Sequence, residues 1–558
     1  MIPIALLLGA ASAIPPSPPQ QLESTSLAGD RPVDGNRFGR FVRTEGPWCF
    51  VACIEQDRLG RPNALGGLGS GSCHVFRRTA AGLERVQVLS HPDPAQMMGF
   101  ARWMGASPGR LVIADDLAVE GPTNVFGGRA YCYERVAGTW SLVQTLRSTA
   151  PGGESVFFGR DGDLEGDRLV LIEFDEGLGN GSDGTYRVFD HNGHEFVESA
   201  RLMSPGPDPA WQFSVPAPIF GPVTVGGNRI VGRTSFDQLL IWKEHPSGWI
   251  LEQRLDPPPV SPVTAYGHGD SVDLEGEWLV ASRDPNSNLH GRVEVYRFEP
   301  ASGRFEHHQT LRARDADPGN GLYADGFGDS LALRDGVLVI GATVALNAIG
   351  SNGGQVFVFE VGPSGNWVPT RRLTSTSAEL DGAIARVGLG AEVSVTDGLV
   401  TATELAGFVT DPAIRSGRVA VFELPIGRRL CDGDGNSVSA QGAALEVLGR
   451  REASYGLWPL RGSSLPPGAL VLPLASRTTG STTVLQGTLC LGGSIHRLGS
   501  AVGMASARGD FESLVASGAV ANEPLIDAGS TWHFQLWYRD VHPLPTANLS
   551  SAVSVMFR

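Results

Sequence analysis

The chain has 558 residues, including 73 Gly and 38 Pro, and only 18% of its residues are charged. This composition favours turns and strands over long surface helices, and the length predicts two to four domains. The formal net charge of −15 repels polyanions at long range, so we expect no binding to nucleic acid.

The first sixteen residues, MIPIALLLGAASAIPP, contain an apolar run that ends in Ala11-Ser12-Ala13. An apolar run followed by small residues is typical of a signal peptide, although no Lys or Arg precedes it here. We therefore expect residues 1–13 to direct export, and the mature protein to be secreted, periplasmic or at the cell surface. A buried first strand is the alternative. No later stretch has the roughly 18 uninterrupted apolar residues of a membrane helix.

A hairpin signal recurs about every 60 residues along most of the chain. GFGDSLALRDGVLVIGA (326–342) follows the similar GHGDSVDLEGEWLVAS (267–282). An acid or Asn beside Gly is the chemistry of a tight hairpin, because Gly tolerates positive φ. The turn glycine recurs as Gly46, Gly109, Gly166, Gly227, Gly276, Gly336 and Gly398.

Two further signals follow each hairpin. The first is an alternating strand such as RVEVYRF, from Arg292, or QVFVFEV, from Gln355. The second is an aromatic residue or Leu six positions before a Leu, as in Trp140 and Leu146. In four of these strands a Gln stands two residues before the Leu. Each repeat therefore predicts four short strands.

A four-stranded unit cannot bury both of its faces alone, and radial stacking of such units is the β-propeller solution. The hairpin and the alternating strand occur seven times, but the closing strand follows only six of them. The N-terminal sequence PQQLEST, with Gln20 and Leu22, supplies the missing pattern. We therefore predict an all-β fold with a seven-bladed β-propeller over residues 19–425, its last blade closed by an N-terminal strand. An open array of hairpins is the alternative.

The repeat resembles the FG-GAP repeat of integrin α-chain propellers, and more closely the FG-GAP-like proteins exported by bacteria. Phe38-Gly39, Phe158-Gly159, Phe220-Gly221 and Phe327-Gly328 carry the first half of the motif, and Ile340-Gly341-Ala342 carries the second. The resemblance covers about 400 residues. It implies secretion and binding at a surface rather than catalysis.

Many FG-GAP repeats hold calcium in a loop of alternating Asp and Asn. Asp284, Asn286 and Asn288 alternate in this way, and their oxygen atoms can converge on a hard cation. Leu289 stands where a Gly would normally let the loop turn. The resemblance thus suggests a calcium site in this loop, with an ordinary solvated Asx turn as the alternative.

Six cysteines are few for this length. In an oxidising compartment we expect a disulfide between Cys431 and Cys490. The pairing of Cys49, Cys53, Cys73 and Cys132 cannot be read from the sequence, and small buried side chains are the simplest interpretation.

The periodicity stops after Leu424, and short strand signals of a different kind follow, such as STWHFQLWYRD from Ser530. We predict a β-sandwich over residues 429–558. Trp532 and Trp537 lie five apart, so they should face opposite sides of a strand. We expect both to pack in the core, and a sugar-binding platform at one of them is the alternative.

No motif in the sequence names a reaction, and no catalytic residue is predicted. His191 and His194 fall in a predicted turn, and the acids are scattered among turns, as solubility demands. The sequence favours an exported, monomeric binding or adhesion protein that presents propeller loops to a protein or polysaccharide at a cell surface. Two alternatives remain open: a polysaccharide-active enzyme with acids at the channel mouth, and a structural component of the envelope.

Overall fold

The structure is a computed structural model that divides the chain into two compact units. The first unit comprises Met1–Thr396 and Val400–Phe422, and the second comprises Asp397–Leu399 and Glu423–Arg558. The structure describes residues 16–17, 20–22, 38–53, 71–79, 82–92, 99–120, 125–148, 156–174, 184–203, 219–234, 237–258, 268–283, 291–313, 326–343, 354–362, 364–374, 387–406, 418–453, 456–516, 526–540 and 546–558.

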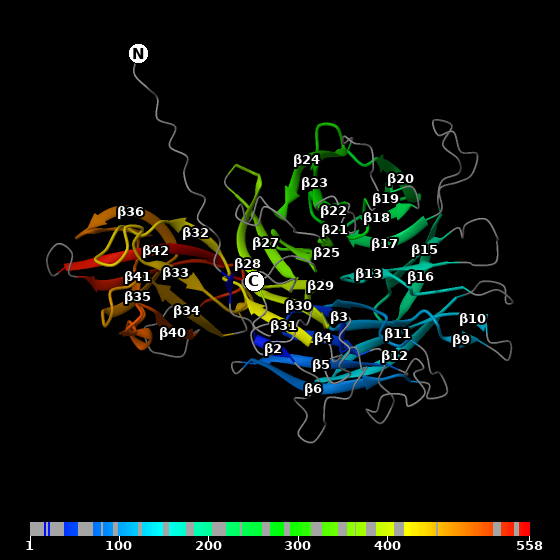
Figure 1. Ribbon diagram of the computed structural model, residues 1–558, viewed down its shortest axis with the longest axis horizontal. Coiled ribbons are helices and arrows are strands. Elements are labelled where there is room, and N and C mark those ends of the chain that lie inside the picture. The colour runs from blue at the N-terminus through cyan, green and yellow to red at the C-terminus, as the bar shows by residue number, and fades with distance from the viewer. Residues whose placement is uncertain are drawn as a thin grey trace, which may run out of the picture. The chain divides into compact units, whose positions relative to one another are not determined.

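The described part of the first unit forms seven large sheets, each with four antiparallel strands, numbered here one to seven in chain order (Figure 1); the sixth also carries β1 as a fifth, parallel strand. Their strands are β3 (Phe38–Glu45), β4 (Trp48–Cys53), β5 (Ser72–Thr79), β6 (Gly82–Ser90); β7 (Trp103–Ser107), β8 (Arg110–Asp115), β11 (Arg129–Val136), β12 (Thr139–Arg147); β13 (Gly162–Glu165), β14 (Arg168–Glu173), β15 (Thr185–His191), β16 (Phe196–Met203); β17 (Ile219–Gly226), β18 (Arg229–Thr234), β19 (Leu239–His245), β20 (Gly248–Leu255); β21 (Val272–Glu275), β22 (Trp278–Arg283), β23 (Arg292–Glu299), β24 (Arg304–Arg312); β25 (Phe327–Arg334), β26 (Val337–Ala342), β27 (Gln355–Val361), β28 (Trp367–Leu373); and β29 (Val387–Thr396), β30 (Leu399–Ala406), β31 (Arg418–Glu423), β2 (Gln20–Leu22). A small hairpin, β9 (Val119–Glu120) and β10 (Val125–Phe126), lies between β8 and β11.

The first strands of the seven sheets contact one another in sequence. β3 contacts β7, β7 contacts β13, and the series continues through β17, β21, β25 and β29. β29 in turn contacts β3, so the series closes on itself. Figure 1 shows these strands gathered around a centre with the fourth strands at the outside. The arrangement is that of a β-propeller-like fold.

The fourth strand of the seventh sheet comes from the N-terminus, as the Gln20 and Leu22 pattern predicts. β2 pairs antiparallel with β31, with Gln20 opposite Val421 and Leu22 opposite Val419. Just before it, β1 (Pro16–Ser17) pairs in parallel with β28 of the sixth sheet. The N-terminal segment therefore lies on the edges of two neighbouring sheets.

The glycines of the FG pairs have positive φ at the start of the first strands. The values are 81° at Gly39, 82° at Gly159 and 98° at Gly328, a region that suits residues without a Cβ. Phe38, Phe158 and Phe327, which precede them, are fully buried. Gly269 and Gly390 also have positive φ, although His268 and Leu389 precede them instead of Phe. The same backbone geometry therefore occurs in repeats that lack the Phe-Gly pair.

Small residues late in the second strands pack against these glycines of the next sheet. A Cβ on Gly390 would lie 2.9 Å from the Cα of Gly341, and one on Gly159 would lie 3.0 Å from the Cβ of Ala114. A Cβ on Gly328 would lie 3.2 Å from that of Ser282. The Phe-Gly half of the repeat and its second half, such as Ile340-Gly341-Ala342, therefore form the two sides of one contact between successive sheets. Larger side chains at this contact would hold the sheets apart.

The glutamines of the fourth strands join neighbouring sheets at their outer edges. Gln253 donates from Nε2 to the Phe305 carbonyl at 2.8 Å and accepts the Phe305 N–H on Oε1 at 2.9 Å. Gln87 bonds Trp140 reciprocally at 2.8 and 2.9 Å. The same two-way pairs join Gln144 to Phe196 and Gln309 to Trp367. The recurring Gln of the sequence is thus a side-chain replacement for strand pairing between sheets.

Removing one of these pairs should destabilise the first unit. Gln253 is 8% exposed, so Gln253→Ala leaves the Phe305 N–H and carbonyl unsatisfied, which costs about 1–3 kcal/mol. Gln253→Glu should lose a similar amount, because an ionised carboxylate accepts the N–H but cannot donate to the carbonyl. Chemical denaturation measures both. The exposed Gln441→Ala is the control and should change stability by less than about 0.5 kcal/mol. Equal stability of Gln253→Ala and the wild type would contradict the role of the pair.

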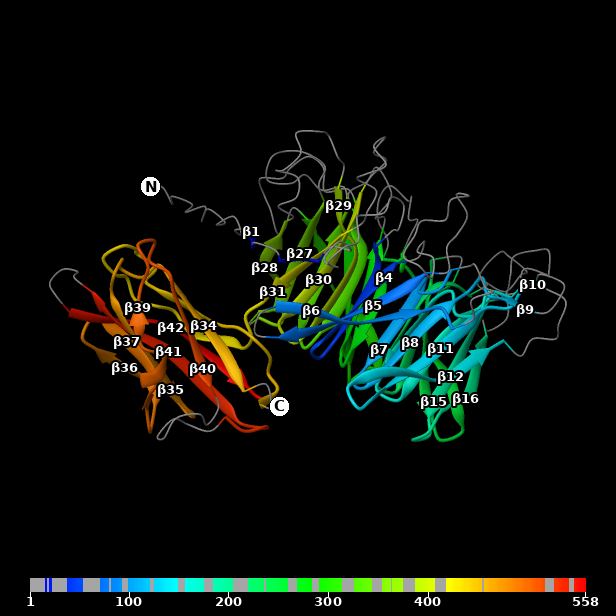
Figure 2. The same ribbon diagram turned by 90° about the horizontal axis from the view of Figure 1, so that it is seen from below.

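The described part of the second unit contains three antiparallel sheets. The largest has the order β32, β42, β41, β35, β38, with β39 also on β35, and β33, β34 and β40 form a second. The strands are β32 (Arg428–Cys431), β33 (Ala444–Val447), β34 (Leu457–Ser463), β35 (Leu470–Ser476), β36 (Thr478–Val484), β37 (Gly487–Gly492), β38 (His496–Arg497), β39 (Gly503–Met504), β40 (Phe511–Ala516), β41 (Thr531–Asp540) and β42 (Thr546–Met556), with a 3-10 turn at Gly499–Ala501. β36 and β37 form the remaining hairpin, seen in Figure 2.

Side chains of the two larger sheets meet in one hydrophobic core. Trp458 of the three-stranded sheet and Trp532 of the larger sheet both belong to this core and are at most 2% exposed. Trp537 is partly buried and packs against a separate small cluster formed by Leu474, Leu491 and Leu549. Both tryptophans therefore serve packing, on opposite faces, as the sequence predicts. Among the described residues, no helix is long and apolar enough to span a membrane.

Candidate functional site

The residues singled out by the sequence do not converge on one site. Asp284, Asn286 and Asn288 lie outside the described residues. Cys431 and Cys490 form a disulfide with a Cα–Cα distance of 6.5 Å. Within the parts of the chain that the structure describes, no group of three or more His, Cys, Asp or Glu is placed to hold a metal ion.

The four remaining cysteines, Cys49, Cys53, Cys73 and Cys132, are buried and not disulfide-bonded. Burial raises the pKa of the Cys49 and Cys73 thiols, and raises that of Cys132 to about 12. Such thiols are poor nucleophiles, because the thiolate is the reactive form. Their role is packing in the first two sheets.

His191 and His194 stand at the turn between β15 and β16. The Asn192 Oδ1 accepts the backbone N–H groups of His194 and Glu195, as in an Asx turn. The His191 ring lies 3.1 Å from the Glu134 carboxylate of the second sheet. This pair of histidines is therefore part of a turn and of a contact between sheets.

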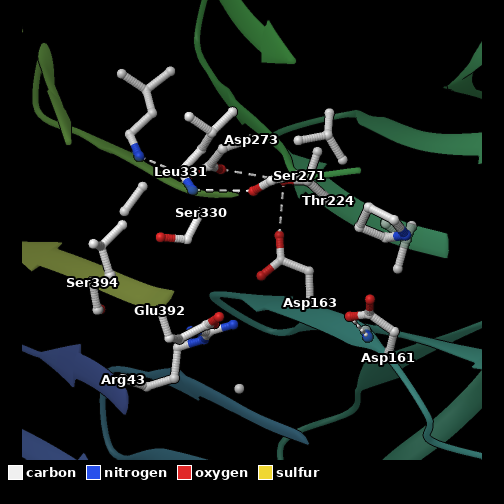
Figure 3. A pocket seen from close by; sticks show the side chains of 18 of the residues that line it. Arg43, Asp161, Asp163, Thr224, Ser271, Asp273, Ser330, Leu331, Glu392 and Ser394 are labelled. Carbon is white, nitrogen blue, oxygen red and sulfur yellow. Dashed lines mark hydrogen bonds and ion pairs between the residues drawn. The ribbon is translucent and has the colours of Figure 1, made fainter. Parts of the chain in front are cut away.

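A cavity of about 300 Å³, called the channel below, lies among the first strands of the first unit. All seven first strands line it, and Figure 3 shows side chains from several of them facing the opening. The channel lining contains seven carboxyl groups and three guanidinium groups, which are those of Asp161, Asp163, Glu165, Asp270, Asp273, Asp329 and Glu392, and of Arg43, Arg160 and Arg334. These acids line a cavity, so solubility alone does not explain where they stand.

Asp163 and Asp273 bind the unpaired edge of the neighbouring first strand. Asp163 Oδ2 accepts the Val225 N–H at 2.8 Å, and Asp273 Oδ2 accepts the Leu333 N–H at 2.6 Å. In each pair the donor lies 60 or 62 residues after the acceptor, which is one repeat. The Thr224 hydroxyl lies between both acids, 3.0 Å from Asp163 and 3.3 Å from Asp273 (Figure 3).

The glutamates two residues later repeat this contact at the tight-turn end of the channel. Glu165 Oε2 accepts the Gly227 N–H at 2.7 Å. Glu275 accepts the N–H groups of Asp335 at 2.7 Å and Gly336 at 3.1 Å. The repeated sequence Asp-Leu-Glu-Gly is thus the visible signal of an interaction between sheets, and sequence reasoning recorded it only as part of a hairpin.

Glu392 and Arg43 close the contact between the seventh and the first sheet. The Arg43 Nη1 lies 2.6 Å from Glu392 Oε1, and Figure 3 shows the two side chains together. Beside them the Thr44 N–H donates to Ser394 Oγ at 3.0 Å. The ends of the ring are therefore joined by side chains as well as by β2.

Asp161 and Asp329 are the channel acids with raised pKa values that do not join two sheets. Burial raises the pKa of Asp161 to about 7, although the hydrogen bond from the Gly162 N–H and the charge of Arg43 both act to lower it. Burial raises the pKa of Asp329 to about 6, although hydrogen bonds from the Thr343 hydroxyl and N–H to its carboxylate act to lower it. Burial, with the nearby Asp163 charge, also raises the pKa of Asp273 to about 6. A group of pKa near 7 is suited to proton transfer.

No protein-family model matches the chain, and no curated protein matches it. Similar solved structures include the β-propeller domain of Cps50 (Swd1) from Myceliophteria thermophila, with a TM-score of 0.38 and 11% identity, covering 69% of this chain and 96% of that one. Sqt1 from Saccharomyces cerevisiae has a TM-score of 0.38 and 10% identity, over 70% and 97%. A protein from Bacteroides uniformis, provisionally assigned as a 6-phosphogluconolactonase, has 0.37 and 14%, over 64% and 89%. These TM-scores are below 0.5, so the likenesses carry no functional weight.

The channel acids should make the stability of the protein depend on pH. In the folded chain Asp161 keeps its proton up to a pH of about 7, whereas an unfolded Asp has released it above about 4. The stability that this proton contributes is therefore present at low pH and is lost as pH rises through 7. Asp161→Asn removes the ionising group, so the stability of the variant relative to wild type should improve by about 2 kcal/mol between pH 5 and pH 8.

Denaturation of both proteins at the two pH values measures this difference. His74 and His268, whose pKa burial lowers to about 4, titrate equally in both proteins and cancel. The surface variant Asp510→Asn is the matched control. A stability difference between Asp161→Asn and wild type that stays constant from pH 5 to pH 8 would show that the channel does not hold this proton.

Proposed function

We propose that the protein is an exported, non-enzymatic binding or adhesion protein of the FG-GAP-repeat type. In this proposal the seven sheets are the blades of a seven-bladed β-propeller over residues 19–425, closed by β2, and residues 429–558 form a β-sandwich. The cyclic contacts of the first strands support the ring. The core shared by two sheets of the second unit supports the sandwich.

The observation that carries the binding function is the distribution of connection lengths. In each of the seven sheets the first and second strands join by a tight turn at one end, and in the first six sheets the third and fourth strands join by a short turn at the same end. The connections between the second and third strands, and those from one sheet to the next, all leave from the opposite end. They include the long stretches 204–218 and 314–325. Long, variable connections on a rigid frame are the usual place for recognition.

The acids of the channel support the same proposal, because most of them have a structural partner. Asp163, Glu165 and Asp273 accept backbone N–H groups of a neighbouring sheet, and Glu392 pairs with Arg43. The Cys431–Cys490 disulfide supports an oxidising location outside the cytosol, as the proposed export requires. The partner in this proposal is a protein or a polysaccharide at a cell surface.

Binding to purified cell-surface polysaccharides and to intact cells, measured with fluorescently labelled mature protein, tests the proposal. Replacing residues 204–218 or 314–325 with short Gly-Ser linkers should weaken binding at least tenfold, because both connections belong to the same end of the ring. A matched Gly-Ser replacement of the turn 300–303 at the other end should leave binding unchanged. Equal binding by all three variants would refute a recognition face made of these connections.

A polysaccharide-active enzyme is the second candidate, and Asp161 is the observation that favours it. Asp161 directly precedes β13, and β13 begins at the end of the ring from which the long connections leave. Its carboxyl group therefore lies toward that mouth of the channel, and its pKa of about 7 suits a proton donor. Release of reducing sugar from the same polysaccharides, lost in Asp161→Asn while binding persists, would assign an enzyme. Absence of release by the wild type would leave the binding function as stated.

We also propose that Asp284, Asn286 and Asn288 hold calcium, on the strength of the FG-GAP resemblance and their alternation. Thermal unfolding in chelator and then in millimolar calcium tests this. Calcium at about 100 times its Kd should stabilise the fold by roughly 2.7 kcal/mol, and Asp284→Asn should abolish the shift. An unchanged melting temperature in wild type on adding calcium would show that this loop is an ordinary Asx turn.

A further inference from the structure

The fourth strand of the seventh sheet differs from the other six. Those six strands have seven to nine residues each and belong to the same stretch of chain as the rest of their sheet. β2 has three residues and comes from the other end of the chain. Its partner β31 has six residues, of which only Val419, Ala420 and Val421 are paired with it.

The N-terminal segment is held by few backbone pairs. β1 contributes two residues to the edge of β28, and β2 contributes three to the edge of β31. Short pairing of this kind opens at low cost compared with the whole fold. When β2 detaches, the outer edge of β31 has no partner strand. This edge lies over the hydrophobic core, because Val419 and Val421 of β31 are buried. An unpaired edge over a hydrophobic core is readily covered by another strand.

A second copy of the chain offers the best-fitting strand for this edge. Its N-terminal segment has the same sequence and therefore the same register on β31 and β28. Residues 23–37 separate β2 from β3, and 15 extended residues reach about 50 Å. The segment can thus leave its own ring without any change in the first sheet.

We propose that β1 and β2 exchange between two copies of this chain, so that each copy closes the seventh sheet of the other. The exchanged dimer contains the same strand pairs as the monomer, and its formation costs only the entropy of association. The monomer predicted from the sequence is then the dilute form, and exchange increases with concentration. A dimer presents two loop faces and gains avidity for repeated surface ligands. The inference goes beyond the proposed binding function and does not depend on it.

A disulfide between facing residues of β2 and β31 reports which copy supplies the strand. Gln21 and Ala420 are directly opposite one another, and facing residues of antiparallel strands are within disulfide reach. Chains carrying Gln21→Cys and Ala420→Cys are prepared with normal and with heavy nitrogen. Equal amounts of the two are mixed, unfolded, refolded and oxidised at low and at tenfold higher concentration. Mass spectrometry of the linked peptides then distinguishes links within one chain from links between chains.

We expect mixed-isotope links between positions 21 and 420, with a fraction that rises severalfold at the higher concentration. The matched control places the same pair in the sixth sheet, at Glu360→Cys and Val368→Cys, which face each other on contiguous strands. That control should give only links of a single isotope. Single-cysteine variants show how much random coupling occurs.

Links of a single isotope at both concentrations would overturn the exchange while leaving β2 in its place. Absence of any link between 21 and 420, with the control link formed, would overturn both the exchange and the pairing of β2 with β31. Neither result touches the proposed binding function, because the measurement contains no ligand.

Discussion

The unpaired edge of each first strand is the constraint on which the ring depends. A sheet of four strands has an inner and an outer edge, and backbone groups left there without partners cost free energy when they are buried. Asp163 and Asp273 satisfy N–H groups of a neighbouring first strand, and the glutamates two residues after them satisfy N–H groups of the turn that follows that strand. Gln253 and its counterparts do the same at the outer edge. Side chains thus replace the strand pairing that a closed barrel would supply.

The same constraint explains the composition of the channel. The carboxylates line the channel because the edges they serve are there, and their mutual proximity then raises the cost of ionising them. Asp273 shows both effects, since it accepts the Leu333 N–H and has a pKa raised to about 6 by burial and by the charge of Asp163. A channel rich in acids can therefore arise from structural needs. Asp161 accepts the Gly162 N–H of its own sheet and also lines the channel.

Close packing between sheets accounts for the small residues of the repeat. Gly341 and Gly390 approach so closely that a Cβ on Gly341 would lie 2.0 Å from the Gly390 carbonyl oxygen. Ala114 and Ser282 occupy the corresponding position beside Gly159 and Gly328. The residue types at these positions can thus differ from one repeat to the next, as long as the residues on both sides of the contact are small.

The sequence by itself determined the repeated four-stranded unit, the N-terminal strand that joins the last sheet and the change of architecture after Leu424. Alternation of apolar residues and turn glycines is local chemistry, so it can be read along the chain. The tertiary structure alone decided what the acids and glutamines do, because Asp163 and Val225, or Gln253 and Phe305, lie 62 and 52 residues apart and meet only when the ring closes. It also decided that the raised pKa of Asp161 exists at all, since burial in a channel between seven strands has no counterpart in the order of residues.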